Sequence, residues 1–111
     1  LDDGNVNGRT VVPSWWISDT MRGGDPLLAR GSAYQKVHPE GSYRNQWWVL
    51  GDERGTLYAA GIHGQFIWID PVSNIVIAKF SSCAQPVGLE LSRAHAAGFR
   101  QIVSLLENRA D

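Results

Sequence analysis

The chain has 111 residues, a formal net charge of −1 at neutral pH and a hydrophobic fraction of 43%, values typical of one globular domain or part of one. Charges of both signs are scattered along it, which excludes a nucleic-acid backbone as a partner, and no apolar run approaches the ~20 residues that cross a membrane. Cys83 is the single cysteine, so no internal disulfide is possible and no redox compartment is indicated.

The first 45 residues predict one short helix within otherwise irregular chain. Residues 1–8 are dense in Asp, Asn and Gly, which favour turns. A helix is expected directly after Pro13, because proline suits the first helical position and apolar residues recur with helical spacing at positions 12, 16, 17 and 21. Residues 22–45 are rich in Gly and Pro and show no steady periodicity. We interpret them as a long connection that lies over the surface of something larger.

From residue 46 the pattern changes to strands, which we expect at 46–50, 56–61, 65–69 and 75–81. The last two alternate only weakly between apolar and polar residues, so we expect both of their faces to be covered. Residues 88–108 predict a closing helix with one wide apolar stripe. The fold class is therefore α+β: an antiparallel sheet of three to four strands, a C-terminal helix packed on it and a short N-terminal helix.

Three segments of the chain resemble one family. Residues 1–16, with the sequence Leu-Asp-Asp-Gly-Asn-Val-Asn-Gly-Arg-Thr-Val-Val-Pro-Ser-Trp-Trp, resemble a segment late in the helical domain of the serine β-lactamase/penicillin-binding superfamily. Residues 43–49 and 61–71 resemble its branch of 6-aminohexanoate-oligomer hydrolases and class C-like esterases, where a Gly-Ile/Val-x-Gly turn precedes an aromatic strand ending in Asp-Pro. The closing helix fits the place where that family's helix packs on the sheet.

The resemblance implies that this chain is the C-terminal portion of a β-lactamase-like fold. We assign residues 1–25 to the end of the helical subdomain, 26–45 to a connecting loop and 46–111 to the sheet subdomain. Because the chain starts at Leu1 rather than Met, we expect a processed or incomplete polypeptide.

The resemblance also implies a serine hydrolase that cleaves a small-molecule amide or ester through an acyl-enzyme, using a Ser-x-x-Lys nucleophile and a tyrosine base. No Ser-x-x-Lys occurs in the 111 residues, so we expect it upstream and expect the chain to be inactive alone. Tyr43-Arg44-Asn45 matches the letters of the family's Tyr-x-Asn motif but comes too late in the chain. We therefore interpret Tyr43 as part of a turn that could line the substrate cleft, rather than as the base.

The family's third motif falls at Ala59-Ala60-Gly61, where Ala59 replaces the usual Lys or His. This replacement argues against recognition of a carboxylate there, and so against β-lactam or peptidoglycan substrates. The backbone keeps its function, because Gly61 lets main-chain groups approach a substrate closely. The resemblance implies that the Ile62 N–H is one donor of the oxyanion hole, a contribution typically worth ~3 kcal/mol. The alternative is that Ile62 is an apolar residue at the edge of the core.

His63 directly follows the proposed oxyanion residue. Strand alternation would turn its side chain away from the side that Ile62 faces, so we favour a structural or cleft-shaping role over acid–base catalysis. His38 and His95 have no partner at a ligand spacing, and we expect neither a metal nor another cofactor. Asp70, before Pro71, is interpreted as a turn former.

The five tryptophans allow a different reading. We expect Trp47, Trp48 and Trp68, on adjoining strands, to pack in the core. The alternative is a non-enzymatic Trp-rich module that holds a ligand such as a sugar, or a partner, and a third possibility keeps the ancestry without activity. Sheet faces that need the rest of a larger domain would be exposed. We therefore expect association with a complementary N-terminal chain or self-association, and no nucleic-acid or membrane partner.

Overall fold

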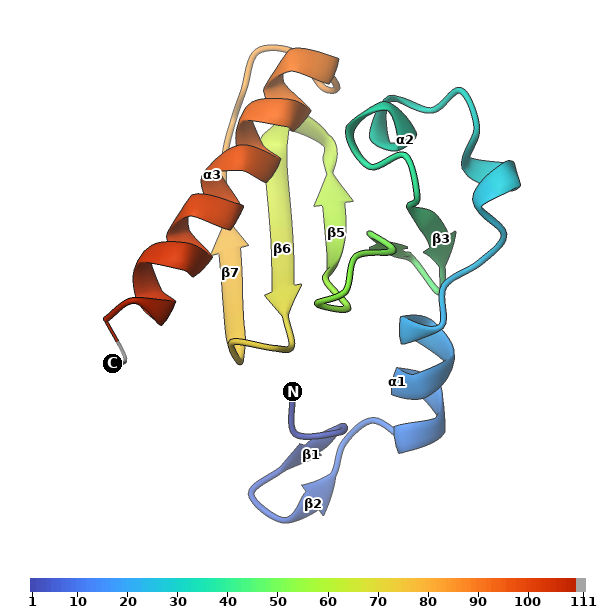
Figure 1. Cartoon of the computed structure of the whole chain (residues 1–111), viewed down its shortest axis with the longest axis vertical. Helices are drawn as coiled ribbons and strands as arrows, with labels where there is room; N and C mark the ends of the chain where they lie inside the picture. The colour runs from blue at the N-terminus through green and yellow to red at the C-terminus, as the bar shows by residue number, and fades with distance from the viewer. Residues whose placement is uncertain (110–111) are drawn as a thin grey trace.

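The computed structural model describes residues 1–109, in which a five-stranded antiparallel sheet carries a long helix on one face (Figure 1). The strands lie in chain order: β3 (Ser42–Arg44), β4 (Trp47–Val49), β5 (Leu57–Gly61), β6 (Gln65–Asp70) and β7 (Ile75–Lys79). The long helix is α3 (Leu89–Glu107). The expected α+β architecture is confirmed, with one strand more than predicted.

The N-terminal third lies beside and below this sheet in Figure 1. It consists of a small hairpin, a first helix, a 3-10 turn and a second helix: β1 (Asn5–Val6), β2 (Arg9–Thr10), α1 (Ser14–Met21), η1 (Pro26–Ala29) and α2 (Ala33–Val37). The predicted helix after Pro13 is confirmed. The predicted connection over residues 26–45 is wrong as a structureless loop, because it contains η1, α2 and β3. No helix among residues 1–109 is long and apolar enough to cross a membrane.

The core lies between the sheet and α3. Tyr58 of β5 and Trp68 of β6 face each other across the register and stack with ring centroids 5.8 Å apart. Phe99 of α3 packs on Trp68 at 5.4 Å, and all three side chains are at most 4% exposed. Burial of each contributes about 1.5–3 kcal/mol. The expectation that Trp68 belongs to the core is confirmed.

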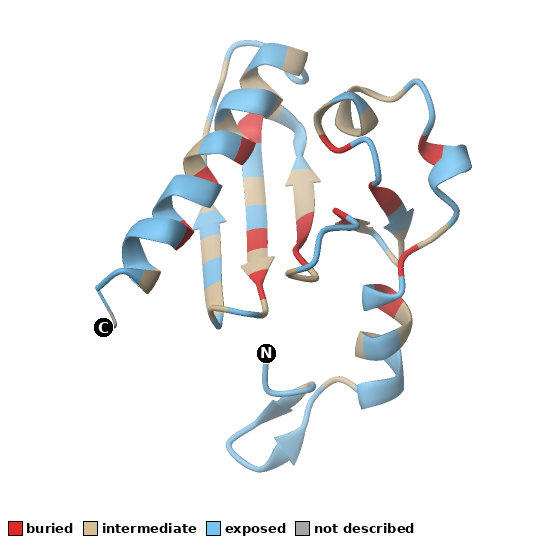
Figure 2. Cartoon of the chain, viewed as in Figure 1, coloured by how far each residue is buried: buried red, intermediate tan, exposed pale blue. Residues whose placement is uncertain are grey.

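The opposite face of the sheet is only partly covered. α1 lies over its β4 end, where Val49 and Leu57 are buried. Towards β7 nothing among the described residues covers it, and Ile67 and Val76 are 42% and 53% exposed. Figure 2 shows β7 banded alternately as exposed and half-buried. The expectation that both faces of the last strands are covered is therefore wrong for residues 1–109, because a single helix can shield one face only.

Candidate active site

The corner that joins β5 to β6, residues 61–64, departs from the predicted strand. β5 ends at Gly61 with an extended backbone (φ −101°, ψ 161°), and Ile62–Gly64 then form a short turn, η2, whose middle residue, His63, is not helical. Both His63 (φ 61°) and Gly64 (φ 80°) take the left-handed conformation. The alternation argument for the direction of the His63 side chain is thus wrong, because the residue lies in a turn and not in a strand.

The Ile62 amide lies on an open part of this corner. Gly61 is exposed, and the Ile62 side chain is 59% exposed. None of the turn and loop hydrogen bonds within residues 1–109 uses the Ile62 N–H. We therefore treat this amide as a candidate donor to an acceptor from outside.

The edge of β5 that leads to the corner is also open on one side. β4 pairs with β5 only through Trp48↔Tyr58 and Val49↔Leu57. Along Ala59–Gly61, no described strand pairs with this edge of β5. An unpaired edge of this kind offers main-chain donors and acceptors to an extended ligand.

A groove of about 410 Å³ begins at the same place and runs across the uncovered face of the sheet. Its lining is mostly small or apolar, and includes Ala59, Gly61, Ile67, Ala78 and Phe80. Ala59 leaves this part of the groove without a cationic side chain of its own. The lysine of the lining, Lys79, already donates from Nζ to the Gly64 carbonyl at 2.8 Å. Side chains therefore bond to carbonyls of the corner, Lys79 to that of Gly64 and Gln65 Nε2 to that of Ile62 at 3.4 Å, but none of the side-chain hydrogen bonds of the described residues uses the Ile62 N–H.

A second, much smaller cleft lies beside the corner, between α2 and the start of α3. Tyr34, Ser92 and His95 line it together with Gly61 and Gly64. Burial raises the pKa of Tyr34, and the neighbouring Tyr43 adds to the effect. Burial, with a smaller contribution from the Lys79 charge, lowers the pKa of His95. Sequence reasoning missed Tyr34 because its helix lay in the segment interpreted as a loop.

His63 holds the loop that leads into α3. Its Nδ1 lies 2.8 Å from the Cys83 carbonyl oxygen. Its N–H donates to the Pro86 carbonyl at 2.9 Å, and its own carbonyl accepts from the Cys83 N–H at 3.0 Å. A structural role for His63 remains a prediction, and these contacts are in keeping with it.

The structure does not bring Tyr43 to the corner. Tyr43 lies in β3, which β4 separates from β5. Its ring packs against Trp48 at 4.8 Å, and its hydroxyl lies 3.2 Å from Gln46 Oε1, in hydrogen-bond contact. Its cleft-lining role stays a prediction that the described residues leave untested.

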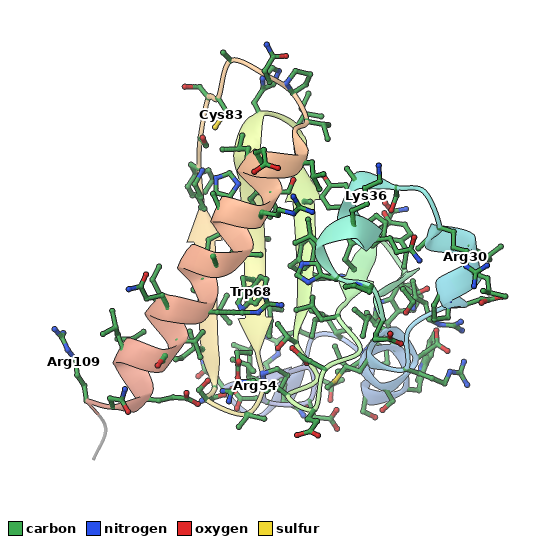
Figure 3. All side chains as sticks on the ribbon, turned by 45° about the horizontal axis from the view of Figure 1, so that its top comes forward. Arg30, Lys36, Arg54, Trp68, Cys83 and Arg109 are labelled. Carbon is green, nitrogen blue, oxygen red and sulfur yellow. The ribbon has the colours of Figure 1, made fainter. Side chains whose placement is uncertain are left out.

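The end of the sheet away from the corner carries an ionic cluster. Figure 3 shows Cys83 and Arg54 at opposite ends of the sheet, with Trp68 between them. There Arg54 binds Asp70, the residue interpreted as a turn former, and Asp70 also accepts from the Ser73 N–H at 3.0 Å. Among residues 1–109, no three His, Cys, Asp or Glu side chains gather so as to hold a metal ion.

Comparison with known proteins yields two informative relatives, although no family model matches the chain. The chain is 41% identical over 86 residues to a 6-aminohexanoate-dimer hydrolase of Paenarthrobacter ureafaciens, a match that covers 78% of this chain and 22% of the relative. A solved structure from Bacillus anthracis, described as a 6-aminohexanoate-dimer hydrolase, superposes with a TM-score of 0.75 at 32% identity. That superposition covers 96% of this chain and 26% of the other, so the chain spans about a quarter of the proteins it matches.

Proposed function

Because this chain belongs to the family of 6-aminohexanoate-dimer hydrolases, we propose that it is the C-terminal segment of a serine hydrolase that cleaves amide or ester bonds through an acyl-enzyme. In this proposal the chain supplies the Ile62 N–H to the oxyanion hole and the groove at Ala59 and Gly61 as a wall of the substrate cleft. The observation that supports it is the Ile62 N–H, which no turn or loop hydrogen bond of the described residues uses, in a residue that is 59% exposed.

In the proposed reaction the Ile62 N–H stabilises the negative charge that develops on the carbonyl oxygen of the substrate. A serine Oγ supplied from outside the 111 residues attacks the carbonyl carbon of the substrate, and a base accepts the serine proton. The carbonyl oxygen becomes negatively charged as the new C–O bond forms, and the Ile62 N–H and the serine's own N–H donate to it. Collapse breaks the bond to the amine or alcohol, which leaves with the proton returned by the base, and the acyl-enzyme remains. Water then attacks the same carbonyl and releases the acid. Donors fixed at the developing charge stabilise both tetrahedral steps.

The lining of the groove favours a class of substrate. The resemblance puts Ala59 at the position of the family's cation, and in the groove Ala59 lies with the apolar Ile67 and Ala78. A groove of this kind suits an uncharged, extended acyl chain better than a carboxylate held close to the reacting bond. Linear amides and esters therefore fit this wall better than β-lactams do.

The proposed partner is the rest of the hydrolase polypeptide. Apolar side chains flank the open edge of β7 on both layers of the fold: Ile67, Val76 and Phe80 on the sheet, and Ile102, Leu105 and Leu106 on α3, each more than 40% exposed. One strand added to β7, with helices over both faces, would bury them all. The relatives are about four times longer than this chain, and that additional length is the occupant we propose. Residues 1–25 then end the helical subdomain and 46–111 belong to the sheet subdomain, while the connection between them, 26–45, contributes β3 to the sheet.

The Trp-rich binding module receives less support from the structure. Trp68 is 2% exposed in the core, and Trp48 is half-buried between two tyrosine rings at 4.8 Å each. Trp48 and Trp68 are thus engaged in packing, whereas the exposed Trp15, 65% accessible, lies in α1 and not on the sheet.

Covalent labelling tests the hydrolase proposal directly. The polypeptide that contains this chain with its upstream sequence should react with a fluorophosphonate and hydrolyse p-nitrophenyl acetate and the linear 6-aminohexanoate dimer. The 111-residue chain alone should do neither. Turnover by the isolated chain would contradict the absence of the nucleophile, and an unreactive longer polypeptide would remove the proposed function.

A further inference from the structure

The corner, residues 61–64, contains a histidine in a backbone conformation that is unfavourable for residues other than glycine. His63 and Gly64 are both left-handed, with φ of 61° and 80°. Glycine takes this conformation freely, but histidine does so at a cost, and such residues persist only where surrounding structure fixes them. The turn between β5 and β6 favours this conformation, and further contacts to His63 come from outside the corner.

The restraint comes from residues 81–86, which we call the strap. His63 makes three hydrogen bonds to it: its N–H donates to Pro86, its carbonyl accepts from Cys83, and its Nδ1 lies 2.8 Å from the Cys83 carbonyl. A carbonyl oxygen can only accept, so Nδ1 carries the hydrogen in this bond. One side chain and its own peptide groups therefore tie the corner to the strap.

Two further features keep the strap and β7 close to the corner. Lys79 Nζ donates to the Gly64 carbonyl at 2.8 Å. A Cβ atom at Gly64 would lie only 2.9 Å from Cys83 Sγ, a separation that side chains do not tolerate. The absence of a side chain at Gly64 thus allows the strap to reach His63.

Ile62 lies between two fixed points, the end of β5 at Gly61 and the tethered His63. The direction of its N–H is set by the peptide plane that Gly61 and Ile62 share, and by the turn that follows. We propose that His63 and Lys79 are positioning residues: by fixing the corner against the strap, they aim the Ile62 N–H at the oxyanion. This inference rests on the proposed function of that amide.

The kinetic test compares variants of the polypeptide that includes the upstream nucleophile. His63→Ala removes the hydrogen bond from the His63 side chain to Cys83 and leaves an alanine in the left-handed conformation. The corner should then shift, and a small misplacement of a catalytic group can cost about 100-fold in rate. We expect kcat to fall about 10- to 100-fold with KM changed less than about threefold, since the donor acts chiefly on the transition state. His63→Asn should recover most of the rate, because asparagine tolerates the left-handed conformation and its amide can donate to Cys83.

Asn74→Ala is the matched control. Asn74 is also left-handed, with φ of 57°, but it lies in the turn between β6 and β7 at the far end of β6. It should retain the kcat of the unmodified protein. An equal fall in kcat for Asn74→Ala and His63→Ala would overturn the proposal, because a general loss of stability would then explain both. An unchanged kcat in His63→Ala would overturn it as well.

Amide hydrogen exchange separates this inference from the proposed function. In the same proteins, His63→Ala and Lys79→Met should each accelerate exchange at the His63 amide at least about tenfold, and Asn74→Ala should not. Unchanged exchange in both corner variants would overturn the positioning role even if the protein is an active hydrolase. Faster exchange in a protein that never reacts with a fluorophosphonate would overturn the proposed function and leave the restraint of the corner established.

Discussion

Arg54 donates two hydrogen bonds to the Asp70 carboxylate, from Nε at 2.6 Å and from a terminal nitrogen at 3.0 Å. The same guanidinium reaches Glu107 near the end of α3 at 2.6 Å. Burial alone would raise the pKa of Asp70, but the bonds from Arg54 and Ser73 outweigh it and hold that pKa below its ordinary value. This cluster joins the β6 end of the sheet to α3, at the opposite end from the corner.

Arg54→Met should therefore destabilise the fold. It leaves the Asp70 carboxylate, 2% exposed, without its charged partner, and we expect the free energy of unfolding to fall by about 2–3 kcal/mol. Urea denaturation at pH 7 measures this. Because the lowered pKa stabilises the fold only above the unfolded pKa of about 4, the difference between the two proteins should shrink as the pH falls below that value. A difference that persisted unchanged at pH 2 would show that Asp70 is not the partner that matters.

His38 makes a second pH-dependent contribution. It is 6% exposed and packs on Tyr58 at 5.4 Å, and burial, followed by the Arg100 charge, lowers its pKa to about 4. The unfolded histidine binds its proton near pH 6.5 and the folded one does not. Stability should be complete above pH 6.5 and decline towards pH 4, by up to about 3 kcal/mol. His38→Phe should flatten the dependence of unfolding free energy on pH in that window, and an equally steep dependence in this variant would exclude His38 as its source.

Association of the isolated chain follows from the open edge and faces of β7. Sedimentation of the 111-residue chain at high concentration should show oligomers, and Val76→Lys should shift them towards monomer, because a charge at an exposed edge strand opposes pairing. Gln101→Lys adds the same charge at an exposed position of α3 and should leave the distribution unchanged. A clean monomer of the unmodified chain would contradict this prediction.

The groove makes a prediction about substrate choice. Ala59→Lys places a cation in the groove beside the corner. In this variant KM for an ester that carries a carboxylate should fall about tenfold relative to KM for the neutral analogue of that ester. One charged hydrogen bond contributes about 1.4 kcal/mol, which corresponds to this factor. Ala59→Met has similar length without the charge and should not discriminate. Steady-state kinetics on the matched pair of esters in the longer polypeptide measures this, and equal behaviour of the two variants would mean that position 59 does not face the substrate.

The sequence predicted the elements whose periodicity is strong and whose partners are near in the chain. The observed first and last residues of β5, β6, β7 and α3 differ from the expected ones by at most two positions. α2 was missed because it is five residues long and depends on its Ser32 cap, whose Oγ accepts from the Gln35 N–H. β3 was missed because its hairpin turn uses Asn45 and Gln46, both left-handed, and glutamine is not a recognised residue for that turn.

The position of the candidate site stays a prediction, and the backbone conformation at that position was missed. Gly61 and Ile62 were identified from a short family pattern, and the structure places them at an exposed corner. The turn at His63 could not be predicted, because its left-handed backbone depends on hydrogen bonds to Cys83 and Pro86 about twenty residues later. The sequence predicted that sheet faces needing a larger domain would be exposed, but it did not show which face, because the residues of a strand do not identify the chain that covers them.

The Ile62→Pro substitution tests the role of this amide most directly. Proline removes the N–H and is preceded by a residue already extended at φ −101° and ψ 161°, the conformation that a residue before proline prefers. In the polypeptide with its upstream nucleophile, kcat should fall by about 100- to 1,000-fold in Ile62→Pro, whereas Ile62→Val, which keeps the N–H, should stay close to the unmodified enzyme. Equal kcat values for the proline and valine variants, with both proteins folded, would contradict the assignment of this amide to the oxyanion hole.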